Sequence, residues 1–228
     1  MIRANRQILL NAHPVGFPAD TDFKMVQIPV PEPGDGELLI RTIYLSLDPY
    51  MRGRMNPGPS YVAGVGLGEV MTAGTVGQVV KSRHGELQEG DFVLSGNGWQ
   101  EYAVSDGRGI RKLDPMTAPI STAIGVLGMP GMTAYVGLLD VGELREGDNV
   151  VVSAASGAVG SVVGQIAKIK GCRVVGVAGA KKKCDYVTYE LGFDACVSHH
   201  SETLLDDLGA VCPSGIDLYF ENVGGRTF

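Results

Sequence analysis

The sequence predicts a mixed α/β protein, with a β-rich first part and a second part in which strands and helices alternate. In the first ~118 residues, short apolar runs rich in β-branched residues are separated by Pro and Gly turns. Pro115 and Pro119 then mark a boundary. From residue 149, a strand pattern, a glycine turn, a helix pattern and a second strand pattern follow within about 30 residues.

We expect residues 1–118 to form a compact, barrel-like β domain. The strand patterns cover residues 37–45, 70–81, 91–94 and 99–104. The same polar turn precedes an apolar strand at residues 89–91 and 146–148, and both turns read Glu-Gly-Asp. We interpret this as similar turn chemistry rather than an internal repeat.

Residues 119–228 are predicted to form a partial dinucleotide-binding domain. An apolar helical segment covers residues 121–139, with a break expected at Met129-Pro130-Gly131. Later helices are predicted at 182–191 and 202–208, and strands begin at Val150, Val174, Ala195 and Ile216. A doubly wound domain of this kind normally has about six strands. Four strands would leave a sheet edge exposed, so we expect a truncated or shortened form of a longer protein.

Small residues occupy the turn between the strand at 150 and the helix that follows. Ala155, Gly157 and Gly160 have the spacing i, i+2, i+5 that is typical of dinucleotide binding, although Ala155 replaces the usual first glycine. Without a Cβ, Gly157 lets the backbone touch a pyrophosphate, and Gly160 lets the helix lie close to the sheet. The amides of Ala158 and Val159 would then face the anion at the helix start.

The end of the second strand indicates which dinucleotide is bound. An NAD site carries Asp or Glu about 20 residues after the glycines. This chain has no acid from Gly176 to Ala180, and Lys181, Lys182 and Lys183 follow. Ammonium groups attract a 2′-phosphate, so the pattern favours NADP(H), although a solvated helix start would also explain three lysines.

Composition restricts the class of protein. The net charge of −6 argues against general nucleic-acid binding or binding to anionic membranes. We expect no transmembrane span and no secretory signal, and therefore a cytoplasmic protein. The four cysteines have no metal-binding spacing, so we expect reduced, structural thiols and no metal.

Five segments together resemble one branch of the medium-chain dehydrogenase/reductase superfamily, the zinc-free, NADPH-dependent alkenal/enone reductases. They are LSLDPYMRGRM (45–55), LGMPGMTAYVGL (127–138), AASGAVGS (154–161), ELGFDA (190–195) and YFENVGG (219–225). The branch includes prostaglandin reductases, plant double-bond reductases and bacterial curcumin reductases. The bacterial group is most similar, partly through residues 98–102 and 198–200. Family chains are longer by about a hundred residues, which agrees with the expected truncation.

The resemblance implies a GroES-like β-barrel domain followed by a Rossmann doubly wound domain, with the active site between them. It assigns the pyrophosphate to Gly157–Gly160 and the 2′-phosphate to Lys183. His199 stands where many relatives have a tyrosine near the adenosine phosphate. Asn222 would contact the cofactor, and Met132 and Thr133 would lie near the nicotinamide.

Zinc is disfavoured by the same resemblance, because zinc-dependent relatives have a Cys ligand near residues 46–49 and a Gly-His-Glu motif that this chain lacks. Conjugate reduction fits a site without zinc: hydride goes to the β-carbon, and the enolate then takes a proton at the α-carbon. Tyr50 is the candidate donor to the enolate oxygen, with a packing role as the alternative. Tyr61 is a candidate for the substrate pocket.

We therefore expect an NADPH-dependent reductase of the C=C bond of α,β-unsaturated aldehydes and ketones. One alternative is an NADPH:quinone reductase of the same superfamily. Another is a catalytically weak NADP(H)-binding fragment. The expected partner is a small enone, enal or quinone, and a homodimer is an alternative to a monomer.

Overall fold

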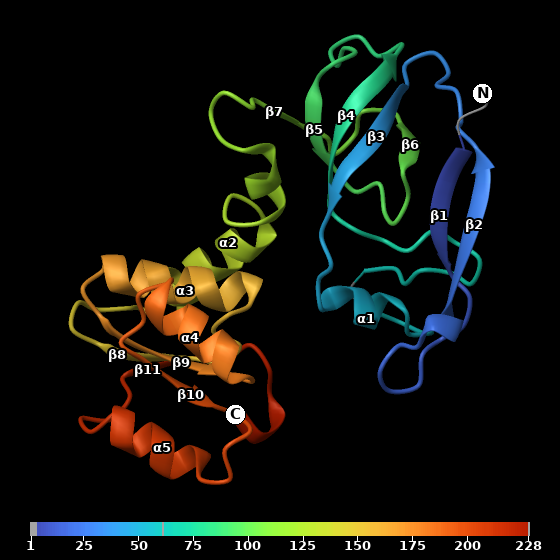
Figure 1. The fold of residues 1–228 in the computed structure, drawn as a ribbon. Coiled ribbons are helices and arrows are strands. Elements are labelled where there is room, and N and C mark those ends of the chain that lie inside the picture. The colour runs from blue at the N-terminus through green and yellow to red at the C-terminus, as the bar shows by residue number, and fades with distance from the viewer. Residues whose placement is uncertain (1–3, 61, 228) are drawn as a thin grey trace. The chain divides into compact units, whose positions relative to one another are not determined.

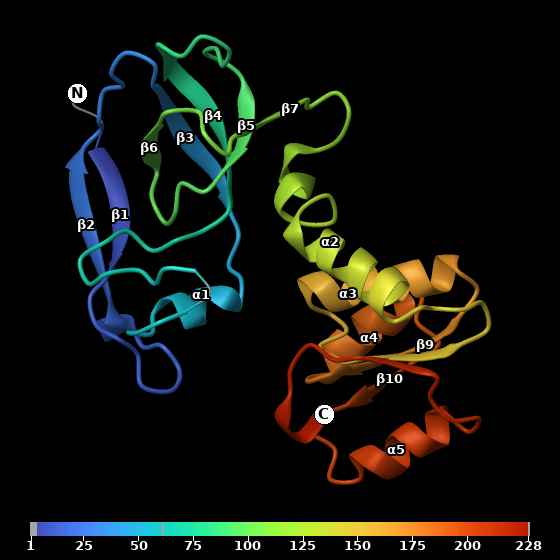
Figure 2. The same ribbon diagram turned by 180° about the vertical axis from the view of Figure 1, so that it is seen from behind.

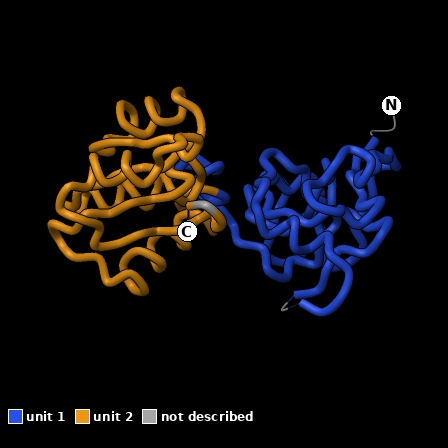
Figure 3. The backbone as a smooth tube through the Cα atoms, turned by 90° about the horizontal axis from the view of Figure 1, so that it is seen from below, with its two compact units in different colours: residues 1–124 blue, residues 125–228 orange. Residues whose placement is uncertain are grey.

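The computed structural model describes residues 4–60 and 62–227, and the chain divides into two compact units, residues 1–124 and 125–228 (Figure 3). The division follows a short 3₁₀-helix, Ile120–Ile124. The boundary expected after residue 118 stays a prediction. Among the described residues, no helix combines the length and the apolar character that a bilayer crossing requires.

Unit 1 is built on a five-stranded antiparallel sheet. Its order is β6 (Tyr102–Ser105), β3 (Leu38–Leu45), β4 (Thr75–Ser82), β5 (Phe92–Ser95) and β7 (Arg111–Leu113). The apolar runs expected for strands form β3 to β6, although the last three begin one to five residues later than predicted. Leu38, Ile40, Val79 and Val93 pack into one buried cluster of this sheet.

A hairpin of β1 (Ala4–Leu10) and β2 (Phe23–Pro29) completes unit 1 (Figure 1). The 3₁₀-helix Asp20–Asp22 precedes β2. Isolated bridges from Gln7 to Gln100 and from Leu9 to Val70 join β1 to the rest of the unit. The short helix α1 (Tyr50–Arg54) contributes Met51 to a second buried cluster. These two antiparallel sheets agree with the GroES-like N-terminal domain that the family resemblance implies.

Unit 2 contains a four-stranded parallel sheet in the order β10-β9-β8-β11. The strands are β8 (Asn149–Val152), β9 (Arg173–Ala178), β10 (Ala195–Ser198) and β11 (Leu218–Phe220). In chain order this is 3-2-1-4, the order of the first four strands of a Rossmann sheet. The prediction of a mixed fold with a Rossmann-type second part is therefore confirmed.

Helices cover both faces of this sheet (Figures 1 and 2). One buried cluster joins Val150 and Val152 to α3 (Ala158–Ile169) and α4 (Lys181–Tyr189). The other joins Val151 and Val175 to α5 (Leu204–Val211). Because successive strand residues point to opposite faces, an unbroken valine run such as Val150–Val152 serves both layers.

The break predicted at Met129-Pro130-Gly131 is wrong in its position. Helix α2 (Met129–Tyr135) begins there, with the proline in its first turn, and a π-helical segment, Val136–Val141, follows it. Proline is accepted in the first turn because the N–H that it lacks has no partner within the helix. A last 3₁₀-helix covers Gly225–Thr227.

Candidate cofactor-binding site

Except for Met132 and Thr133 on α2, the candidate residues of unit 2 follow the carboxyl ends of its strands. These strands are parallel, so their carboxyl ends share one edge of the sheet, where open α/β sheets bind ligands. β8 leads into residues 153–160, which we call the glycine turn. β9 leads into residues 179–183, the lysine turn. β10 and β11 lead into His199 and Asn222 respectively.

The glycine turn presents uncapped backbone amides. The Gly157 N–H donates to the Ala154 carbonyl at 2.8 Å, and Ala154 has a positive φ of 45°. Gly157 is the N-cap of α3, and no side chain caps the helix start within the described residues. The first turn of α3 also contains no acidic residue. The amides of Ala158 and Val159 are therefore suited to an anion.

Gly160 is required by close packing. A Cβ on this residue would lie 2.5 Å from the Ala154 carbonyl oxygen and 3.0 Å from the Ala155 Cα. Gly157 is less constrained, since its Cβ would lie 3.0 Å from the same oxygen. Any side chain at residue 160 would thus push α3 away from the turn.

Ala155 replaces the first glycine of the motif, and a glycine on the neighbouring strand β9 makes room for its methyl group. Ala155 is fully buried, and its amide donates to the Val177 carbonyl at 3.1 Å. Its methyl group lies 2.8 Å from the position that a Cβ on Gly176 would take. Gly176 therefore makes the room that Ala155 occupies.

The three lysines of the lysine turn are exposed, but they differ in whether a carboxylate neutralises their charge. The Lys181 Nζ forms an ion pair with Asp185 at 2.7 Å, one helical turn later. The side chains of Lys182 and Lys183 are exposed, with no ion pair to another described residue. No carboxylate stands between the end of β9 and Lys181. The turn can therefore offer ammonium groups to a phosphate.

His199 lies against the lysine turn. The His199 amide donates to the Ala178 carbonyl at 2.9 Å, which holds the loops after β9 and β10 together. The His199 ring packs on the His200 ring, with centroids 4.2 Å apart. Its Cε1 lies 3.1 Å from the position of a Cβ on Gly179. The imidazole is exposed.

Ser153 holds Asn222 in place, and the sequence did not single it out. The Asn222 amide N–H donates to the Ser153 Oγ at 2.6 Å, and its Nδ2 donates to the Ser153 carbonyl at 2.9 Å. Ser153 is fully buried at the end of β8, beside β11. These bonds orient the side-chain amide and leave its Oδ1 to accept a bond from a ligand. The only sequence signal was a polar residue at a strand end.

Glu221 shapes the turn that carries Asn222. Its Oε1 accepts from the amides of Val223 and Gly224 at 2.5 and 2.6 Å. Burial opposes ionisation, but the nearby Tyr219 hydroxyl and the hydrogen bonds from these amides outweigh it and hold the pKa of Glu221 below its usual range. Burial and this carboxylate in turn raise the pKa of Tyr219 to about 12. The Tyr219 hydroxyl donates to the Thr227 carbonyl.

Met132 and Thr133 lie on α2 in the same unit, and both are exposed. The Thr133 hydroxyl donates to the Met129 carbonyl at 2.8 Å, one turn earlier in the helix. Its proton is therefore used within α2, and its oxygen remains an acceptor. Ala134 next to them is fully buried in the cluster that α3 shares, so α2 is held firmly on this face of the sheet.

Tyr50 begins helix α1 in unit 1 and is half-buried. Burial first and the Asp48 carboxylate second raise the pKa of its phenol, so the hydroxyl stays protonated at neutral pH. The Arg54 guanidinium lies 5.7 Å above the ring. Arg52 instead holds the preceding loop, through the Pro14 and Gly16 carbonyls at 2.8 and 3.0 Å. Tyr61 lies outside the described residues.

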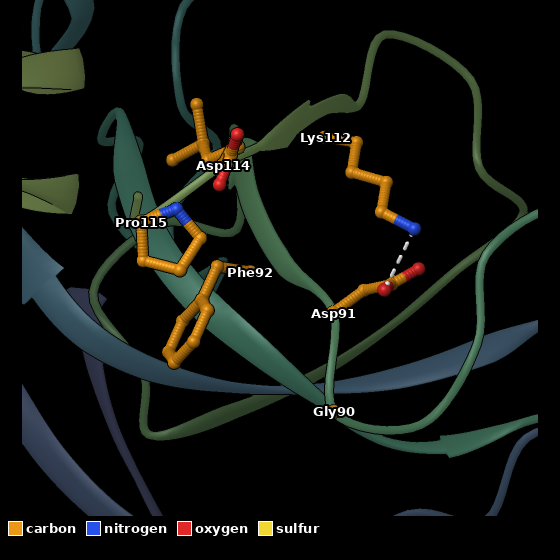
Figure 4. A pocket seen from close by; sticks show the side chains of 7 residues that line it. Gly90, Asp91, Phe92, Lys112, Asp114 and Pro115 are labelled. Carbon is orange, nitrogen blue, oxygen red and sulfur yellow. Dashed lines mark ion pairs between the residues drawn. The ribbon is translucent and has the colours of Figure 1, made fainter. Parts of the chain in front are cut away.

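Two hollows in unit 1 hold none of the candidate residues. One, of about 390 Å³, includes Phe92 and Pro115 beside an ion pair of 2.8 Å between Lys112 and Asp91 (Figure 4). The other, of about 420 Å³, is apolar and includes Leu47 and Trp99. Across residues 4–60 and 62–227, His, Cys, Asp and Glu nowhere gather in a group of three that could hold a metal ion.

The sequence is similar to characterised oxidoreductases over nearly its whole length. Residues 6–113 match the model described as the N-terminal domain of oxidoreductase, and residues 158–228 match that of zinc-binding dehydrogenase. The NADPH-dependent curcumin reductase of Escherichia coli (strain K12) is 52% identical over 98% of this chain and 65% of that protein. The NADP(+)-dependent 2-alkenal reductase of Nicotiana tabacum is 41% identical over 98% of this chain and 67% of that protein.

A solved structure agrees with this similarity. The crystal structure of CurA in complex with NADPH from Vibrio vulnificus matches with a TM-score of 0.93 and 53% identity, over 98% of this chain and 66% of that one. This chain thus spans about two thirds of the length of these relatives.

Proposed function

Because this chain belongs to the alkenal/enone reductase family of medium-chain dehydrogenases/reductases, we propose that it binds NADPH and reduces the C=C bond of α,β-unsaturated aldehydes and ketones. The observation that carries the proposal is the helix start at Gly157, whose amides have no capping side chain, beside a strand end without an acid. Both features suit a phosphorylated dinucleotide.

The proposed cofactor contacts follow from the groups that the edge of the sheet offers. The turn from Gly157 to Gly160 would hold the pyrophosphate through the amides of Ala158 and Val159, and Lys183 with His199 would hold the 2′-phosphate. Asn222 would accept a bond through its Oδ1. Met132 and Thr133 would lie at the nicotinamide. When bound, NADPH supplies the hydride that the β-carbon of the substrate receives.

Tyr50 is the proposed donor to the substrate oxygen. Its raised pKa keeps the phenol neutral, and a neutral hydroxyl can stabilise the negative charge that develops on an enolate oxygen. Tyr61 is the proposed substrate-pocket residue. We also propose that the protein works in the cytoplasm, in keeping with four free thiols, and that a homodimer is an alternative to a monomer.

The test uses the whole 228-residue chain. Titration with NADPH and NADH, followed by cofactor fluorescence, should show tighter binding of NADPH. Steady-state assays with a 2-alkenal, a curcumin-like enone and a quinone should show consumption of the alkenal and the enone. Turnover of the quinone alone would favour the quinone reductase. Tight NADPH binding without turnover would favour a binding role, and no binding of either cofactor would refute the proposal.

A further inference from the structure

Two of the four cysteines lie together beside the lysine turn, and the proposed reduction uses neither of them. Cys184 is in the first part of α4, directly after Lys183, and Cys196 is in the middle of β10. Both are half-buried and α4 packs on β10. Cys172 and Cys212 are buried elsewhere, in two different clusters.

The two sulfur atoms converge on one point. The Sγ atoms of Cys184 and Cys196 each lie 3.8 Å from the same atom, the Val197 carbonyl oxygen. Across the sheet, Cys196 pairs with Gly176, and its Sγ lies 3.3 Å from the position of a Cβ on that glycine. Gly176 therefore leaves room for the Cys196 side chain on the face that α4 covers.

A disulfide would need only a local approach. The two sulfur atoms of a disulfide are separated by about 2.05 Å. Because both Sγ atoms already contact the same carbonyl oxygen, movement of the two side chains can bring them to this separation. The backbone of α4 already lies over β10, so no strand or helix has to cross the sheet. Within the described part of the chain, the Cys172 thiol instead donates to the Arg145 carbonyl, and Cys212 is buried in the other cluster.

Because both thiols converge on the Val197 carbonyl oxygen, we propose that Cys184 and Cys196 are a redox modification site, which forms a reversible disulfide when the protein meets a peroxide. The Cys184 sulfur attacks one peroxide oxygen, which breaks the O–O bond, releases water and leaves a sulfenic acid. The Cys196 sulfur then attacks the Cys184 sulfur and displaces the second water. The two thiols together lose two electrons and two protons, and the peroxide is reduced.

The order of these steps follows from the surroundings of the thiols. Burial first, and the neighbouring Cys184 second, raise the pKa of Cys196, so this thiol stays protonated and is a poor first nucleophile. Cys184 is on a helix at the surface of the unit, close to the helix start and to three lysines. We therefore assign the first attack to Cys184.

The disulfide would join the two elements that flank the adenosine end of the proposed site. The lysine turn runs into α4, and His199 follows β10. A bond between Cys184 and Cys196 would fix the start of α4 to this strand. Closing the short loop between them should raise the melting temperature by roughly 5 °C.

The experiment exposes the reduced whole chain to one equivalent of hydrogen peroxide and then alkylates it in denaturant. We expect two of its four cysteines to resist alkylation. Before alkylation, the oxidised chain should be about 2 Da lighter than the reduced chain, and dithiothreitol should restore both the mass and the alkylation of all four thiols. No Lys or Arg lies between residues 184 and 225, so trypsin alone leaves both cysteines in one peptide. Further cleavage after Glu190 and Glu202 should give residues 184–190 linked to 191–202.

Cys184→Ser is the decisive control, because this side chain is half-buried and its replacement should leave the fold intact. The variant should lose the protected pair and the rise in melting temperature. The proposal is overturned if all four thiols of the native chain remain alkylatable, or if the bond involves Cys172 or Cys212. Stable oxidation of Cys184 without a bond to Cys196 would also overturn it.

Discussion

The glycine turn and the lysine turn lie at the same edge of one sheet, but they offer an anion different groups. The glycine turn uses backbone amides that are held by buried contacts, such as Gly160 against the Ala154 carbonyl. The lysine turn uses exposed ammonium groups on long side chains. Anion binding by the glycine turn therefore depends on packing, and anion binding by the lysine turn depends on charge. Changes in the glycine turn should affect every dinucleotide, and changes in the lysine turn should affect only the phosphorylated one.

Gly160→Val should have the largest effect. The added side chain would meet the Ala154 carbonyl, which lies 2.5 Å from a Cβ at this position. We expect a loss of about 3 kcal/mol in the free energy of unfolding and a roughly hundredfold loss in affinity for NADPH and NADH alike. Urea denaturation and cofactor titration would measure the two losses.

Gly209→Ala is the matched control, because a Cβ on this residue of α5 has no atom within 4 Å. This substitution should leave cofactor binding unchanged and stabilise the protein by up to about 1 kcal/mol. If Gly160→Val bound either cofactor normally, the glycine turn would not be the pyrophosphate site.

Asp194→Ala should destabilise unit 2 without affecting either turn. The Asp194 carboxylate accepts from the Val174 amide at 2.6 Å and pairs with the Lys168 Nζ at 3.0 Å, at the other end of the sheet. Losing both bonds should cost about 2 kcal/mol in the free energy of unfolding at neutral pH. The ratio of NADPH to NADH affinity should stay constant in the folded variant.

The pH dependence of this loss can be predicted in sign. Burial opposes ionisation of Asp194, but the Val174 amide and Lys168 outweigh it, so its pKa is lowered on folding. Its contribution is therefore complete above the pKa of an unfolded aspartate, about 3.9, and disappears as the pH falls through the folded value. Urea denaturation at several pH values should show the two proteins converging in acid. A constant difference would contradict this assignment.

Lys183→Ala should separate the two cofactors. Removing an ammonium group that binds the 2′-phosphate should weaken NADPH binding by about tenfold and leave NADH binding unchanged. The difference should shrink as salt is added, since the side chain is exposed. Equal losses of affinity for both cofactors would show that Lys183 does not bind the 2′-phosphate.

Asp185→Ala should have the smallest effect. Its ion pair with Lys181 is exposed, so the free energy of unfolding should change by less than about 0.5 kcal/mol. The released Lys181 would add positive charge to the lysine turn, and NADPH affinity should rise by no more than about threefold. An equal rise in NADH affinity would mean that the stronger NADPH binding does not come from the 2′-phosphate.

Sequence by itself determined the order of the elements in unit 2, the spacing of Ala155, Gly157 and Gly160, and the lack of an acid after β9. These features are local. Strand and helix periods, turn residues and a strand end can be recognised within a few dozen residues of chain. The glycine spacing predicted the pyrophosphate site, and the missing acid together with the three lysines predicted the 2′-phosphate site.

Only the tertiary structure decided which distant residues meet. Ser153 reaches Asn222 across 69 residues because β8 and β11 are neighbours in the sheet. Gly176 makes room for Ala155 because β9 lies beside β8. Cys184 and Cys196 share the Val197 carbonyl because α4 packs on β10. Strand order depends on the burial of both sheet faces at once. Because this is a property of the packed domain, the sequence pattern of a single segment does not predict it.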